Sequence, residues 1–188
     1  MKLLKFEEYS LVTESIRYHL DNGLSISESI YRIGSDAYCD FVCEIRKLHK
    51  EGKIELDEED QFIVEKLNTG VKAIFKIRGS GDKLGKTINV VLDTPEVADK
   101  DETSKYIVYR DSGKKEDGKI LAYKIGFGSK DHTIENCGEE NEGRRKSFLA
   151  RHQCDEKTLE KDGDSAGWRS CNVHKFRKQL KLKCNNPW

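Results

Sequence analysis

The sequence has no long apolar run, little proline and no net charge, and each of these absences narrows what the chain can be. No stretch approaches the roughly 18 apolar residues that a membrane span needs, and Glu7 and Glu8 stand where a secretory signal would be apolar. Only two prolines occur in 188 residues, while Ile, Leu, Val, Tyr and Phe recur in periodic blocks. We therefore expect a globular protein of a cytosol-like compartment, with no membrane partner.

The formal net charge of zero conceals an uneven distribution of charge. Residues 141–188 hold twelve Lys and Arg against six Asp and Glu, whereas residues 1–140 hold 22 against 28. Opposite charge on two parts of one chain suits docking to a partner of patchy charge. An uneven scatter of solvated charges is the alternative interpretation.

Apolar residues recur with helical spacing through the first 70 residues. The strongest pattern runs from Ser35, a residue type typical of N-caps, to Gly52, which follows a Lys-rich last turn as a helix stop. Shorter stripes predict a second helix over residues 11–20 and a third after Asp57. We predict a helical N-terminal subdomain over residues 1–70.

From about Val71 the apolar spacing changes to every second residue. β-Branched and aromatic blocks predict strands over residues 73–77, 87–92, 106–109 and 120–127. Residues 111–118 predict a hairpin with a long mobile tip, and residues 79–82 and 94–104 are linker candidates. The expected fold is α+β: the helical subdomain, a small antiparallel sheet over residues 71–130, and a compact basic module over residues 131–188.

Four residues of the C-terminal module are of the types that bind zinc. His152-x-Cys154 and Cys171-x-x-His174 supply two imidazoles and two thiols, and the connection between the pairs is long enough to fold back. We predict a structural zinc site formed by His152, Cys154, Cys171 and His174.

Alternatives to zinc stay open at this point. Cys154 and Cys171 are otherwise buried thiols or an oxidised pair, with His152 in an ordinary hydrogen bond. In a reducing compartment thiols and metal ligands are more common than disulfides. Cys39 and Cys43, four residues apart on the strongest helix, are predicted to be small core thiols.

Cations and aromatic residues flank these Cys and His residues. Such a set could contact a protein partner, or bind phosphates and stack on bases in a nucleic acid. Acidic residues between positions 155 and 164 interrupt the basic pattern and disfavour nucleic acid. The candidate partner-binding residues are Arg144, Arg145, Lys146, Arg151, Trp168, Lys175, Arg177 and Trp188.

A metal-dependent nuclease or hydrolase is a further alternative. His152, Cys154, Asp162, Asp164 and His174 are residue types that such a centre uses. Their spacing singles out no acid–base pair, so we assign no catalytic residue and favour a protein without enzymatic activity.

Four motifs resemble a family of proteins encoded by tailed bacteriophages and some large DNA viruses. The family has a hairpin that ends in Phe-Gly, an Arg-rich segment of the form RRKSFxARHxC, a Lys/Asp-rich loop and an aromatic strand of the form YWSC. The matching residues here are Gly126-Phe127-Gly128, Arg144 to Cys154, Lys161-Asp162 and Ala166 to Cys171, and stretches within residues 18–53 are similar as well.

The resemblance implies a structural accessory protein of a virus particle. Such a protein would be made in the host cytoplasm, assemble into the capsid, neck or tail of a phage virion, and act through contacts with other virion proteins in an oligomeric assembly. Two departures from the family pattern stand out: Gly167 replaces the expected tyrosine, and the family pattern has no counterpart of His174. The second departure weakens the fourth ligand of the predicted zinc site.

Overall fold

The computed structural model describes residues 2–3, 12–77, 85–130, 142–157, 165–173 and 180. It has the expected α+β fold. Two compact units are present: unit 1 is Met1–Thr94 with Asp111–Tyr123, and unit 2 is Pro95–Arg110 with Lys124–Trp188. Within the described residues, no helix combines the length and the apolar character needed to cross a membrane.

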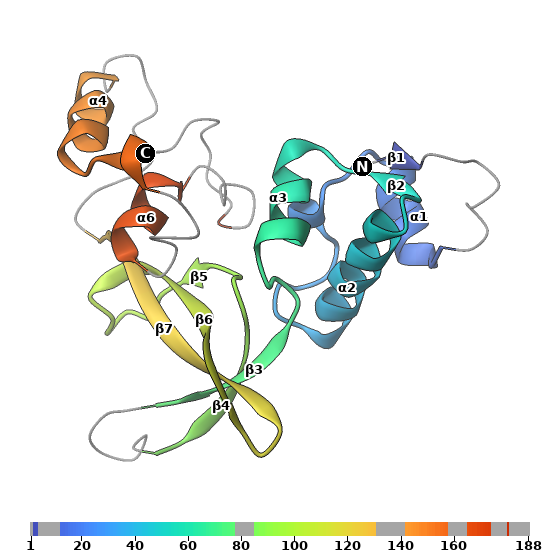
Figure 1. The fold of residues 1–188 in the computed structure, drawn as a ribbon, viewed down its shortest axis with the longest axis horizontal. Coiled ribbons are helices and arrows are strands. Elements are labelled where there is room, and N and C mark those ends of the chain that lie inside the picture. The colour runs from blue at the N-terminus through green and yellow to red at the C-terminus, as the bar shows by residue number, and fades with distance from the viewer. Residues whose placement is uncertain are drawn as a thin grey trace. The chain divides into compact units, whose positions relative to one another are not determined.

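Helices form the N-terminal part of unit 1, as the sequence predicts (Figure 1). They enclose a cluster of buried side chains to which α2 contributes most, and Ile16 of α1 and Ile63 of α3 complete it from either side. Each fully buried aliphatic side chain contributes roughly 1.5–3 kcal/mol. The elements are α1 (Glu14–Asp21), the 3-10 turn η2 (Ile26–Glu28), α2 (Asp36–Lys50) and α3 (Glu58–Lys66).

The long helix α2 begins and ends where its sequence indicates. The Ser35 hydroxyl accepts a hydrogen bond from the Tyr38 amide at 3.2 Å, and the helix ends just before Gly52. Burial raises the pKa of the Cys39 thiol, which is a core thiol as predicted. Cys43 is exposed, because it lies at the border of the buried stripe, so the prediction of a core thiol there was wrong.

Side chains also fix both ends of α3. The Asp57 carboxylate accepts from the Asp60 amide at 2.8 Å and caps the first turn. Buried Asp60 in turn accepts from the Ile26 amide at 3.0 Å, which ties α3 to η2. At the other end, the Arg46 guanidinium donates to the carbonyl oxygens of Val64, Leu67 and Thr69 at 3.0, 3.2 and 2.8 Å. These bonds satisfy carbonyls that a helix end leaves unpaired.

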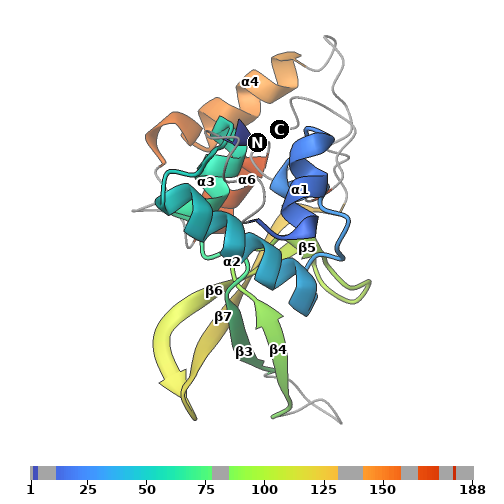
Figure 2. The same cartoon turned by 90° about the vertical axis from the view of Figure 1, so that its right-hand side faces the viewer.

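The described strands form two sheets. A two-stranded sheet pairs β1 (Lys2–Leu3) with β2 (Ile54–Glu55). The five-stranded sheet has the order β4-β3-β7-β6-β5. Figure 2 shows β6 and β7 as a long twisted hairpin. The bounds are β3 (Lys72–Lys76), β4 (Thr87–Val91), β5 (Glu96–Val97), β6 (Ser104–Glu116) and β7 (Lys119–Ser129).

Two details of the sheet differ from the prediction. β3 pairs with β7 in parallel, through Ile74 opposite Leu121 and Phe75 opposite Ala122, so the sheet is mixed and not antiparallel throughout. The hairpin has no long tip, because β6 continues to Glu116 and a two-residue turn follows. Asp117 and Gly118 both have positive φ, 49° and 77°, as the tight Asp-Gly hairpin turn requires. Of the two linker candidates, residues 94–104 contain β5 and residues 79–82 lie outside the described part.

Candidate functional site

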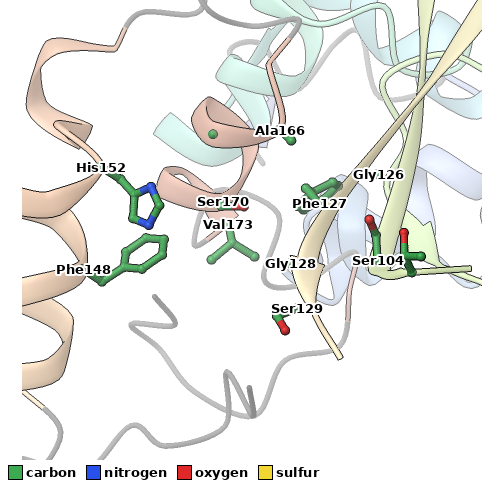
Figure 3. Close-up of a pocket in the computed structure, with 12 residues that line it drawn as sticks. Ser104, Gly126, Phe127, Gly128, Ser129, Phe148, His152, Ala166, Ser170 and Val173 are labelled. Carbon is green, nitrogen blue, oxygen red and sulfur yellow. The ribbon is translucent and has the colours of Figure 1, made fainter. Parts of the chain in front are cut away.

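Unit 2 contains a cleft with a volume of about 490 Å³ (Figure 3). Its walls come from the end of β7 with the start of β6, from α4 (Glu142–Arg151), and from α6 (Ala166–Cys171) with the residues that follow it. Its size falls in the range of ordinary ligand and side-chain pockets.

The strand wall is formed by residues 126–129 together with Ser104. A Cβ atom on Gly126 would lie 2.4 Å from the Ser104 hydroxyl oxygen, so a larger residue here would force Ser104 of β6 to move. Phe127 is 2% exposed and packs against Tyr106, with ring centroids 5.6 Å apart. The Phe-Gly motif that we noted in the sequence therefore fixes the shape of this wall.

The α4 wall presents two rings to the cleft. Phe148 and His152 are four residues apart and share one helix face, and their ring centroids lie 4.4 Å apart. Both rings point from α4 toward Ser170 and Val173 (Figure 3). The His152 side chain is exposed, and its backbone carbonyl accepts a hydrogen bond from the Lys157 ammonium group.

The α6 wall is made of small side chains. The Ser165 hydroxyl caps this helix by accepting from the Trp168 amide at 3.0 Å. Ala166, Gly167 and Ser170 line the cleft, whereas the opposite face of α6 is buried. Because the lining side chains are short, α6 leaves the space open.

A disulfide joins the two helical walls. Cys154 lies in the 3-10 turn η4 (Cys154–Glu156), three residues after α4, and Cys171 is the last residue of α6. Their sulfur atoms are 2.10 Å apart and their Cα atoms 5.4 Å apart. Cys171 is buried and Cys154 is half-buried. The predicted convergence of these two residues is therefore present, in the oxidised form that we kept as an alternative.

Zinc binds the thiolate form of cysteine, and Cys154 and Cys171 have no thiol while they are joined in a disulfide. The predicted zinc site therefore requires the reduced chain. His152 faces the cleft, and His174 lies outside the described residues. Within the described part, no group of three or more His, Cys, Asp or Glu residues could hold a metal ion. The residues described here do not fit zinc in this oxidised state, and the site stays a prediction for the reduced protein.

Among the described residues, the lining of the cleft carries no Asp, Glu, Lys or Arg, and cations lie near its edge. Lys157 Cε lies 3.3 Å from where a Cβ on Gly167 would be, so this side chain borders the cleft. Arg151 is exposed on α4 next to His152. Such a site favours a ligand with an apolar group and negative charge beside it.

The predicted partner-binding residues do not all lie on one exposed surface of the described structure. Lys146 and Arg151 are exposed on α4, and Arg144 and Arg145 belong to the same helix. Trp168 is only 2% exposed, and the Arg169 guanidinium carbon lies 5.1 Å from its ring centroid. Trp168 is thus part of the interior of unit 2 and not an exposed anchor, because it shares the inner face of α6 with Cys171. The remaining three, Lys175, Arg177 and Trp188, lie outside the described residues.

The described lining of the cleft includes three serines and His152, and Ser170 is the serine that lies on the α6 wall toward which the His152 ring points. In the described part of the chain no hydrogen bond joins the two side chains, and the carboxylates Asp162 and Asp164 of the hydrolase hypothesis lie outside it. Sequence reasoning did not assign Ser170 or Val173 to a site. The signal that could have found Ser170 is its position inside the motif from Ala166 to Cys171.

Comparisons with models of known families, with curated proteins and with solved structures found no match to this chain.

Proposed function

We propose that this protein is a structural accessory protein of a virus particle, as in tailed phages, and that it acts through protein contacts at the cleft of unit 2. One observation carries the proposal. Gly126-Phe127-Gly128, the segment from Arg144 to Cys154 and the segment from Ala166 to Cys171 resemble the viral family, and all three border this cleft. Motifs that are separate in the sequence thus form one surface.

The physical character of the cleft supports a binding role. A crosslink joins its two helical walls, and its described lining residues are mostly small or apolar and include no Asp, Glu, Lys or Arg. A preformed site of this kind loses little entropy when a partner docks. Shape and apolar contact are enough to bind a protein segment, and no catalytic group is needed.

The test is the presence of the chain in purified particles. Mass spectrometry on particles of the encoding virus, banded by density, should recover the protein at a fixed ratio to the capsid protein. A deletion of the gene should yield incomplete or unstable particles. Complete absence of the protein from intact particles, together with normal particles from the deletion, would contradict the proposal.

Nucleic-acid binding is the second candidate, because α4 exposes Lys146 and Arg151. Titration of the protein with duplex and single-stranded DNA across a salt series tests it. Affinity that falls steeply with salt, and that the triple replacement of Arg144, Arg145 and Arg151 by Ala abolishes, would favour this candidate. Salt-insensitive or absent binding would leave the protein-contact role as the better explanation.

A further inference from the structure

Helix α1 of unit 1 has an exposed face that is acidic and aromatic. Glu14, Tyr18 and Asp21 follow one another at spacings of four and three, which places them on one side of the helix. All three are exposed, and Tyr18 exposes 46% of its surface. The opposite side is fully buried through Ile16 and His19. A large aromatic side chain that remains exposed is characteristic of interface anchors.

The cleft of unit 2 has the complementary chemistry. Phe148 offers apolar surface above the buried Val173, the α6 wall is made of small side chains, Lys157 borders the cleft, and exposed Arg151 precedes His152 on α4. A volume of about 490 Å³ accommodates a tyrosine side chain with part of the helix that carries it. The view in Figure 3 shows the two rings of α4 on one side of this space and the end of β7 on the other.

The charges of the two units are also complementary. Unit 2 contains seventeen Lys and Arg against fourteen Asp and Glu, and unit 1 contains seventeen against twenty. Two copies of the chain therefore attract each other when unit 1 of one meets unit 2 of the other, whereas contacts between like units are repelled. A second copy is the partner that this pattern fits.

We propose that the α1 face of one copy docks in the unit 2 cleft of a second copy, with Tyr18 as its apolar anchor. This inference rests on the proposed protein-contact role of the cleft and names the partner. In the complex the Tyr18 ring lies among Phe148, Val173 and the small residues of α6. Glu14 lies near the cations at the edge of the cleft.

Such a contact joins two different surfaces, so each bound copy still presents one free face and one free cleft. Contacts of this type propagate into rings or open chains and do not stop at a dimer. Self-association should therefore grow with concentration and weaken with salt, because part of the attraction is between exposed charges.

The experiment is sedimentation velocity on the full-length oxidised chain over a concentration series at low and high salt. Wild-type protein should form species larger than dimers at low salt. Tyr18→Ser, which removes the anchor, and Ala166→Trp, which fills the cleft from an exposed position, should each raise the dissociation constant about tenfold or more. Circular dichroism should be unchanged in both variants.

Two control substitutions match these variants. Ile88→Thr changes another exposed apolar residue of unit 1, on β4, and should associate like wild type. Arg151→Glu should weaken association more than Lys146→Glu, since residue 146 faces away from the side of α4 that carries Phe148. Equal effects of the two charge reversals would point to general electrostatics and against the cleft.

Mixing the two disabled variants provides the decisive measurement. The Tyr18→Ser variant retains its cleft and the Ala166→Trp variant retains its α1 face, so the mixture should form a one-to-one dimer and stop there. A wild-type monomer at every concentration, or a mixture that shows no dimer, would overturn the inference. Either result would leave incorporation into particles, and with it the proposed function, as a separate question.

Discussion

The two units of this protein hold their helices in place by different means. In unit 1, the fifteen-residue helix α2 buries a continuous apolar stripe against α1 and α3, so noncovalent packing, with hydrogen bonds from Arg46 and to Asp60, fixes the arrangement. In unit 2, α6 is only six residues long and follows segments rich in charge, and a covalent bond ties its last residue to η4. Short helices are marginal without tertiary support. The helices of unit 1 are therefore held by noncovalent contacts, while the α6 wall of the unit 2 cleft also has a covalent crosslink.

Reduction of the disulfide should produce the largest difference between the units. In the chain-entropy model, a crosslink between residues 17 apart contributes about 3 kcal/mol. A dithiol reductant, which forms its own disulfide as it converts Cys154 and Cys171 to thiols, should loosen α6 and the cleft and leave unit 1 folded. Hydrogen exchange with and without the reductant measures this unit by unit.

Variants of single residues check the same comparison. Cys154→Ser should reproduce the effect of the reductant on unit 2, and Cys43→Ser, at an exposed free cysteine, should have none. Ile45→Ala in α2 should destabilise unit 1 by about 2–5 kcal/mol whether or not the reductant is present. If the reductant leaves the exchange of α6 unchanged, packing is sufficient in unit 2 as well and the contrast between the units disappears.

Alkaline pH should also act on unit 2, through Tyr109. Burial, and then the nearby carboxylates Glu96, Glu102 and Asp99, raise the pKa of this phenol from 10.0 to about 12. Between these two pH values the unfolded chain loses the phenolic proton and the folded chain keeps it, so stability falls as pH rises. The slope is about 1.4 kcal/mol per pH unit inside that window, and below pH 10 this group has no effect.

Tyr109→Phe removes the phenol and should flatten this part of the pH profile. Denaturant unfolding of the wild type and the variant at several pH values from 8 to 12 measures the difference. A parallel decline of both proteins through the window would assign the alkaline sensitivity to other groups.

The comparison also explains which features the sequence could predict. Helix α2 was predictable because its cap and its apolar period agree, and its fold is mostly local. The parallel pairing of β3 with β7 was not, because strand blocks in a sequence carry no record of which strand lies beside which. Alternating apolar residues identify strands, but tertiary packing selects their neighbours.

Some features of the candidate site were also predictable from the sequence, and others were not. Four-residue spacing on a helix is enough to place Phe148 beside His152, and the Cys154–Cys171 pairing agrees with the predicted convergence of the two thiols. Whether sulfur binds sulfur or a metal depends on oxidation state, which spacing does not report. The burial of Trp168 was not predicted, because aromatic residues among cations are typical of exposed contact surfaces. Its place on the inner face of a short helix depends on tertiary packing, which the local sequence does not report.

The smallest expected effect concerns the helix caps, and it distinguishes the two units at single residues. Asp57→Ala and Ser165→Ala each remove one side-chain acceptor from a first helical turn, at a cost of about 1 kcal/mol. In α3 the buried Ile63 and the bond from Ile26 to Asp60 still hold the helix, so exchange should rise only slightly.

Helix α6 has only six residues, so the Ser165 cap is a larger part of what holds its first turn, beside the buried Trp168 and Arg169 and the disulfide at its last residue. Ser165→Ala should therefore raise amide exchange at the first turn of α6 more than Asp57→Ala does in α3. Ser165→Asp, which restores an acceptor and adds a charge favourable at a helix N-terminus, should return exchange to the wild-type level. Equal exchange in the two Ala variants would mean that α6 is held along its whole length by packing, and that the open wall of the cleft needs no cap.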